Sequence, residues 1–132
     1  MKRTPLILAA ALFLAGCSMN PPPVPNAAVE DFVIANQLES SDRVRTRERD
    51  SWVALNNRYV IWNSRRQKYL LEFRRECKAL TNTYDKAPDV RMDQGTLRAR
   101  MDTLRGCMIS HIYLITSDQR KELKSLGDAP GS

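Results

Sequence analysis

The sequence predicts an α+β fold: a small, curved, barrel-like antiparallel sheet of about four or five strands, with one helix before it and one after it. Apolar residues recur at steps of three and four over residues 27–40, which is typical of a helix with one buried face. The middle of the chain holds short β-branched and aromatic runs separated by polar turns, which is typical of antiparallel strands. Near the C-terminus, Thr116 and Gln119 fit a capping box, which marks the start of a second helix.

Residues 1–16 are predicted to be a signal peptide rather than part of the domain. Lys2 and Arg3 are followed by an apolar run of about a dozen residues, whereas a membrane-spanning helix requires roughly 20. A basic start, a short apolar stretch and small residues before a cleavage site are typical of secretory signals. We therefore expect this segment to be removed.

The residues LAGC, at positions 14–17, resemble the lipobox of bacterial lipoproteins, in which the cysteine is acylated and becomes the first residue of the mature chain. The resemblance implies that Cys17 anchors the protein in a membrane, which two or more acyl chains do stably. Serine rather than aspartate at position 18 resembles an outer-membrane address, so the domain is expected to face the periplasm. An ordinary secretory signal, in which Cys17 is discarded, is the alternative interpretation.

The segment after the cysteine is expected to be a tether that leads into the first helix. Prolines fix φ and remove backbone donors, so residues 17–26 are predicted to form an extended, semi-rigid spacer. The helix is predicted in residues 27–40, with Asn26 as its N-cap. Its apolar face contains Val29, Phe32, Val33, Ala35 and Leu38.

Arginines recur at every second position between residues 43 and 49. In a strand this spacing places one set of side chains on the same face: Arg43, Arg45, Arg47 and Arg49. Val44 and Thr46 would then lie on the opposite face. The alternation therefore predicts a strand with a dense ridge of positive charge.

The clearest strands are predicted at residues 59–63 and 68–73, joined by the polar turn SRRQ at residues 64–67. The first is β-branched and aromatic, and the side chains of the second alternate between two faces. Tyr69 and Phe73 fall on one face of the second strand, and Glu72 falls on the other. Two strands joined by a short polar link predict a hairpin.

The chain after the hairpin is predicted to begin with a loop, over residues 78–95, because it is rich in Asn and Asp and contains Pro88. Alternation over residues 96–104 predicts a half-buried strand whose inward side chains are Leu97, Ala99 and Met101. The long apolar run at residues 105–116 predicts the last strand.

The second helix is predicted to end at Gly127, since glycine is the commonest helix terminator. The expected organisation is therefore a single domain over residues 27–127, followed by a disordered tail at 128–132. A domain of this length can bury one core but not two independent ones.

Assigning Cys17 to the lipid leaves Cys77 and Cys107 as a pair. Two thiols in an oxidising compartment predict a disulfide. Metal binding or redox catalysis is the alternative, but the pair lacks C-x-x-C spacing and His111 is the only histidine. We expect neither a metal nor another cofactor.

The charge of the chain is positive and unevenly distributed. The formal net charge of +6 falls by 2, to +4, when Lys2 and Arg3 are removed. A basic face would suit anionic lipid headgroups, lipid A phosphates or an acidic protein surface, whereas a solvated face with no partner is the alternative. Nucleic acid is not expected in the predicted compartment, and nothing indicates an oligomeric state. The candidate partner-binding residues are Arg43, Arg45, Arg47, Arg49, Arg65, Arg66 and Lys68.

No catalytic motif is present. The sequence lacks a G-x-S-x-G elbow, a glycine-rich phosphate loop and an H-E-x-x-H helix. His111 lies within an apolar run and is expected to be a partly buried structural residue. We therefore expect a non-enzymatic envelope lipoprotein that binds another envelope component. The alternative is a small-molecule or glycan-binding module, catalytic or not, with Trp52, Trp62 and His111 in a groove.

The segments YVIWNSRRQKYLLEFRREC and CMISHIYLIT resemble a family of small proteobacterial envelope proteins of unknown function. The resemblance extends from about Phe32 to Gly127, and Leu114 and Ile115 replace the proline and leucine that are usual there. It implies the pairing of the two cysteines and the envelope compartment. Its motifs contain no catalytic residues, so it implies no activity.

Overall fold

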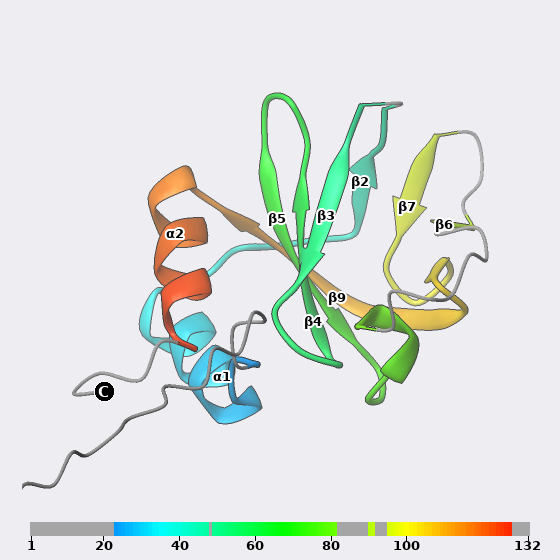
Figure 1. The fold of residues 1–132 in the computed structure, drawn as a ribbon. Helices are drawn as coiled ribbons and strands as arrows, with labels where there is room; N and C mark the ends of the chain where they lie inside the picture. The colour runs from blue at the N-terminus through cyan, green and yellow to red at the C-terminus, as the bar shows by residue number, and fades with distance from the viewer. Residues whose placement is uncertain (1–22, 48, 82–89, 92–94, 128–132) are drawn as a thin grey trace, which may run out of the picture.

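The computed structural model describes residues 23–47, 49–81, 90–91 and 95–127, and Figure 1 draws the rest as a thin grey trace. The predicted signal peptide, the lipidated Cys17, the sorting residue Ser18 and the predicted tail at 128–132 lie outside these residues. Among the described helices, none has the length and apolar character that crossing a bilayer requires.

The fold is α+β, as predicted, and it combines two helices with a mostly antiparallel sheet (Figure 1). The sheet runs in the order β3-β4-β5-β9-β8-β6, and β1 also pairs with β9. A separate ribbon pairs β2 with β7. The main sheet is curved but not closed, so the expectation of a barrel-like sheet is wrong. The elements are α1 (Asn26–Ala35), β1 (Ser40–Ser41), β2 (Arg43–Arg45), β3 (Ser51–Ala54), β4 (Tyr59–Asn63), β5 (Lys68–Phe73), η1 (Lys78–Leu80), β6 (Val90–Arg91), β7 (Thr96–Arg98), β8 (Thr103–Leu104), β9 (Cys107–Ile115) and α2 (Ser117–Ser125).

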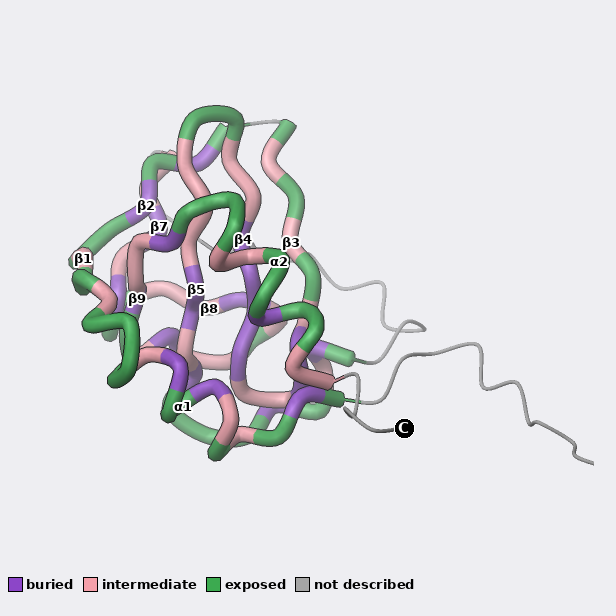
Figure 2. Tube along the Cα trace, turned by 90° about the vertical axis from the view of Figure 1, so that its left-hand side faces the viewer, coloured by how far each residue is buried: buried purple, intermediate pink, exposed green. Residues whose placement is uncertain are grey.

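The β4–β5 hairpin has the bounds and the alternation that the sequence predicts. It pairs in antiparallel register, with Val60 opposite Leu71 and Ile61 opposite Leu70. Both faces of the hairpin are buried, because each strand carries apolar side chains on both sides. Figure 2 shows these strands buried along their centres below an exposed turn.

The hairpin separates two apolar cores. On one face Leu71 and Phe73 pack with Val44 of β2, Leu97 of β7 and Leu104 of β8. On the other face a second cluster forms beneath both helices, and it contains Tyr59, Ile61, Leu70 and Ile115 from the sheet with Val29, Phe32 and Leu123 from the helices. Both helices therefore cover the same face of the sheet, and the β2–β7 ribbon covers the other (Figure 1).

The predicted capping box of α2 is confirmed. The Thr116 hydroxyl accepts from the Gln119 backbone N–H at 3.0 Å, and the Gln119 side chain accepts from the Thr116 N–H at 2.9 Å. The helix ends at Ser125, before Gly127, which the sequence offered as the terminator. The α1 helix begins one residue earlier than expected, with Pro25 rather than Asn26 at the N-cap.

The last residues of the predicted tether belong to the fold. Val24 is 4% exposed and packs in the core beneath the helices. Its N–H donates to the Leu55 carbonyl at 3.0 Å, and its own carbonyl accepts from the Asn56 side chain at 2.6 Å. The Asn56 amide also donates to the Asn26 side chain at 2.9 Å. The chain is therefore held from Val24 onward, three residues before the expected start of the domain.

The strand predicted at residues 96–104 is broken in the middle. β7 pairs with β2, β8 pairs with β9, and a turn with Arg100 at φ 66° connects them. Leu97 and Ala99 point inward as predicted, but Met101 is 65% exposed. The strict alternation was misleading because the chain changes partner strands within this segment. The predicted loop over 78–95 also contains η1 and β6 in its described parts.

The predicted disulfide between Cys77 and Cys107 is confirmed, with their Cα atoms 6.2 Å apart. It connects the segment after β5 to the first residue of β9. Cys77 is buried in the core beneath the ribbon, and Cys107 packs against that core.

Replacing both cysteines by serine should lower the free energy of unfolding by about 3–4 kcal/mol, because the bridge closes a loop with a sequence separation of 30. Urea unfolding of the full chain measures this loss as a shift in midpoint. The wild type under reducing conditions is the matched control and should show the same shift. An unchanged midpoint in both would contradict a stabilising role for the bridge.

Candidate functional site

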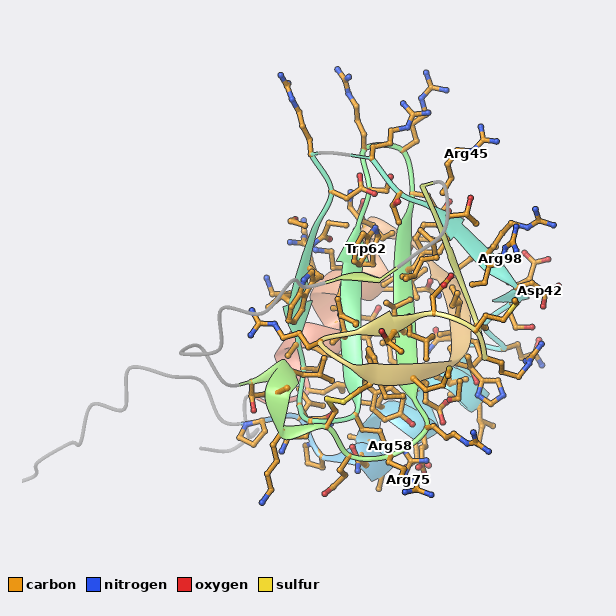
Figure 3. All side chains as sticks on the ribbon, turned by 90° about the vertical axis from the view of Figure 1, so that its right-hand side faces the viewer. Asp42, Arg45, Arg58, Trp62, Arg75 and Arg98 are labelled. Carbon is orange, nitrogen blue, oxygen red and sulfur yellow. A yellow bond between two sulfur atoms is a disulfide. The ribbon has the colours of Figure 1, made fainter. Side chains whose placement is uncertain are left out.

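Two basic segments that are separate in the sequence meet at one end of the molecule. The β4–β5 turn and β2 lie at the same end, and together they enclose a cleft of about 120 Å³. We call it the basic cleft, and it is lined by Arg45, Arg47, Ser64, Arg65, Arg66, Gln67 and Tyr69. Figure 3 shows Arg45 near this end and Arg58 and Arg75 near the opposite end.

The first side of the basic cleft follows from the alternation in β2. Val44 and Thr46 are buried against the ribbon core, so Arg45 and Arg47 point outward. Arg43 is exposed in β2 as well, so the predicted alternation is found over residues 43–47. β2 is short, but the alternation of burial continues beyond its last residue.

The second side of the basic cleft is the β4–β5 turn. The Ser64 N–H donates to the Gln67 carbonyl at 3.0 Å, which closes a tight turn with Arg65 and Arg66 at its centre. Both arginines are exposed, since side chains at the centre of a hairpin turn have no facing strand.

Two side-chain contacts hold the turn in place. The Gln67 amide donates to the Lys68 and Ile115 carbonyls at 2.8 and 3.0 Å, which ties the turn to the end of β9. The Lys68 ammonium donates to the Ser64 carbonyl at 3.1 Å. Lys68 was a predicted partner-binding residue, but here it bridges the turn and does not line the cleft.

Tyr69 is the aromatic residue of the cleft lining, and its phenol is a hydrogen-bond donor at neutral pH. Burial, and then the negative charge of Asp50, raise the pKa of Tyr69 above its usual range. The Asp50 carboxylate is itself engaged, because one oxygen accepts from the Arg47 backbone N–H and from the Trp62 indole, both at 3.0 Å.

The four arginines of the cleft have no ion-pair partner among the described residues: Arg45, Arg47, Arg65 and Arg66. Like charges held near one another repel, and this repulsion opposes folding. A local loss of folding stability of this kind is typical of sites that serve binding rather than stability.

Two predicted partner-binding residues lie outside the cleft lining. Arg43 is exposed and pairs across the ribbon with Arg98, while Arg49 is exposed beyond the end of β2. Sequence reasoning did not name Ser64 or Gln67 individually as binding residues. The available signal was their position, because they flank the basic turn that the sequence identifies.

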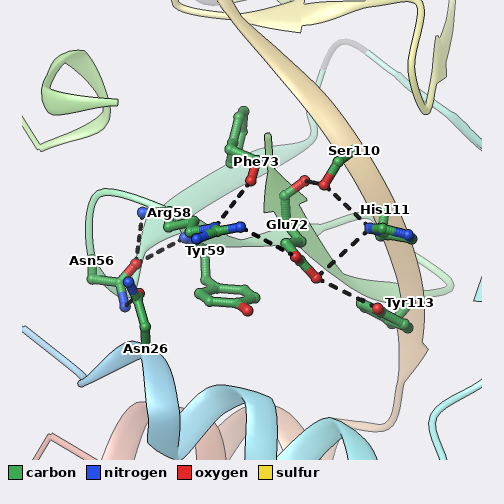
Figure 4. Close-up of polar contacts among 9 residues, drawn as sticks. All are labelled: Asn26, Asn56, Arg58, Tyr59, Glu72, Phe73, Ser110, His111 and Tyr113. Atoms are coloured by element: carbon green, nitrogen blue, oxygen red, sulfur yellow. Dashed lines mark hydrogen bonds and ion pairs between the residues drawn. The ribbon is translucent and has the colours of Figure 1, made fainter. Parts of the chain in front are cut away.

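A second polar cluster lies on the sheet face that the helices cover, near the last residues of β5 (Figure 4). The half-buried Glu72 carboxylate lies 3.9 Å from Arg58 and 3.8 Å from the His111 ring, and it accepts from the Tyr113 hydroxyl at 3.4 Å. His111 stacks on Tyr113 with ring centroids 6.0 Å apart. Arg58 is the ion-pair partner of Glu72 and Tyr113 is its hydrogen-bond donor, so the charge of Glu72 is balanced by residues within the fold.

The expectation that His111 is partly buried in an apolar strand is wrong, because its side chain is 52% exposed. A β-bulge is the reason. Glu72 pairs with His111, but the next residue, Phe73, pairs with Ile109, so the alternation in β9 shifts by one residue at this point.

The alternative site, with Trp52, Trp62 and His111 in one groove, is not assembled. Trp62 is 4% exposed in the ribbon core, and Trp52 packs there beneath the Arg105 guanidinium, 5.4 Å from its ring centroid. His111 lies on the opposite face of the sheet with Glu72. In the described part of the chain, no three histidine, cysteine or acidic side chains are grouped to hold a metal ion.

A family model of a family of unknown function, DUF6491, matches residues 1–127. The chain belongs to DUF6491. This confirms the expectation, drawn from the hairpin and β9 motifs, that the chain belongs to an uncharacterised family. No curated protein and no solved structure matches this DUF6491 protein.

The tyrosines beside Glu72 predict a loss of stability at alkaline pH. Burial, and then Glu72, raise the pKa of both Tyr59 and Tyr113 above their usual range. A raised pKa adds stability that is complete below the unfolded value of about 10 and is lost as the pH rises through the folded value.

Tyr59→Phe should therefore flatten the fall in unfolding free energy above about pH 10, because the buried Tyr59 phenol can no longer ionise on unfolding. Urea unfolding at a series of pH values measures this change in the pH dependence of the unfolding free energy. Tyr69→Phe is the control, because its less buried phenol should change the pH dependence less. Wild-type and Tyr59→Phe curves that remain parallel through this range would contradict the prediction.

Proposed function

We propose that this DUF6491 protein is a non-enzymatic, lipid-anchored protein of the bacterial cell envelope whose basic cleft binds an anionic group on another envelope component. Cys17 is its anchor, the outer membrane its location, and the domain faces the periplasm. The observation that carries the proposal is the convergence of Arg45 and Arg47 with Arg65 and Arg66 around one cleft, where none of the four forms an ion pair with another described residue.

The chemistry of the cleft lining suits binding. A guanidinium presents several N–H donors in a planar fork, and it binds carboxylate or phosphate groups through paired hydrogen bonds. Arginine also remains charged at every physiological pH. Tyr69 adds a phenol hydroxyl, which is protonated at neutral pH. The cleft therefore offers several donors and positive charges to a single anionic group.

The short connection to the predicted anchor supports action close to a membrane. Six residues lie between Cys17 and Val24, the first buried residue of the fold. A proline-rich segment extends by about 3 Å per residue, so the domain would remain within roughly 20 Å of the bilayer surface. A partner of this protein is therefore a component of the envelope.

Charge reversal in the cleft should abolish capture of the partner. The double variant Arg45→Glu, Arg65→Glu replaces one cation on each side of the cleft, and we expect at least a tenfold loss of partner recovery. The measurement is quantitative mass spectrometry after chemical crosslinking in cells, with a tagged full-length chain.

The matched control is Arg74→Glu, Arg75→Glu. These two arginines are exposed after the end of β5, away from the cleft lining, and their reversal changes the net charge equally. Equal partner recovery in wild type and cleft variant, with both folded, would overturn the proposal. If partner recovery falls equally in the two double variants, binding depends on net charge rather than on the cleft.

A further inference from the structure

We propose that the basic cleft binds a phosphate group carried by a molecule that approaches from the side facing away from the protein's own membrane anchor. The inference rests on the proposed function. It adds the chemistry of the bound group and the direction from which that group arrives.

The size of the cleft limits what enters it. A cavity of about 150 Å³ holds a single benzene molecule, and the basic cleft is smaller, at about 120 Å³. The cleft is therefore large enough for one small anionic group, while the remainder of the ligand lies outside its lining.

The number and arrangement of the donors favour phosphate over carboxylate. A carboxylate has one negative charge and two oxygens, whereas a phosphate monoester carries about −1.5 to −2 at neutral pH and three acceptor oxygens. Arg45 and Arg47 come from β2, and Arg65 and Arg66 come from the turn. One phosphate can accept from both sides of the cleft at once, and the Tyr69 hydroxyl can donate to it as well.

The direction follows from where the chain joins the fold. Val24 bonds to Leu55 and Asn56, which lie in the connection between β3 and β4. The cleft lies at the turn that follows β4, so the two points are separated by the length of that strand, roughly 16 Å at about 3.3 Å per residue. Figure 3 shows the same separation, with Arg45 near one end and Arg58 near the other.

The shortness of the connection opposes binding to the protein's own bilayer. The seven Cα-to-Cα steps from Cys17 to Val24 span at most about 25 Å when fully extended. To point the cleft at the protein's own bilayer, the connection would have to extend past the length of β4 and of the arginine side chains beyond it. That distance is nearly the whole reach of the connection. Binding to its own bilayer would thus need an almost fully extended connection, which favours a phosphate from elsewhere, carried either by a soluble molecule or by a lipid headgroup of a second membrane.

The first experiment tests the chemistry with the full-length chain and glycerol phosphate as the probe. Isothermal titration calorimetry should show binding of glycerol phosphate but not of acetate at equal ionic strength. Binding should weaken at least tenfold in Arg45→Gln, Arg66→Gln and remain unchanged in Arg74→Gln, Arg75→Gln. Tyr69→Phe, which keeps the ring, should weaken binding to a smaller degree.

Acetate binding equal to that of glycerol phosphate would overturn the phosphate assignment, as would binding that is insensitive to the cleft variant. If the charge-reversal variant nevertheless loses its partner in cells, the proposed function survives and the anionic group is a carboxylate on an acidic protein. The cleft is rejected as a binding site if its variants change neither the binding of glycerol phosphate nor the recovery of the partner in cells.

The second experiment tests the direction with the lipidated chain in phosphatidylcholine vesicles. Separate vesicles that contain phosphatidic acid should be captured if the phosphate is a lipid headgroup of another membrane. No capture, with glycerol phosphate binding intact, would identify a soluble phosphate as the source, which also agrees with the proposal. Phosphatidic acid placed in the protein's own vesicles should not compete with glycerol phosphate, and competition there would overturn the direction.

Discussion

Burial of the β4–β5 hairpin on both faces is the constraint from which the rest of the structure follows. Leu71 and Phe73 belong to the core beneath the β2–β7 ribbon, and Leu70 belongs to the core beneath the two helices. Covering both faces brings distant parts of the chain onto one hairpin. Charged side chains are consequently displaced to the two ends of the strands, where water remains accessible.

Glu72 is a charged residue of the hairpin that is half-buried on the face beneath the helices. Its surroundings show how the fold accommodates the charge. A half-buried carboxylate is costly unless it is paired, and Glu72 has Arg58, His111 and Tyr113 around it. The contrast with the basic cleft is instructive. There, four arginines lie close together with no such partner among the described residues, although acidic residues are common in the chain.

Local features of the fold could be predicted from the sequence because their causes are local. The hairpin bounds follow from β-branched and aromatic runs around a polar turn, and the α2 cap follows from Thr116 and Gln119. The disulfide could be predicted by counting thiols. The exposed arginines of β2 follow from alternation with Val44.

Features that depend on tertiary pairing could not be predicted. The bulge beside His111 and the change of partner strand at Arg100 both interrupt an alternation that looks continuous in the sequence. The docking of Val24 on Asn56 was hidden by the surrounding prolines. Both basic segments were identified as candidates, but their meeting in one cleft depends on how β2 packs across the hairpin.

The central claim is that the fold holds the cleft arginines together for a ligand and gains no stability from them. The most direct test is the unfolding free energy of Arg47→Gln, Arg65→Gln at low ionic strength, compared with the wild type and with Arg74→Gln, Arg75→Gln. The account predicts that the cleft variant alone is more stable than the wild type, and that the difference vanishes near 1 M salt, where charges are screened within about 3 Å. A cleft variant less stable than the wild type would contradict it, because these arginines would then be structural.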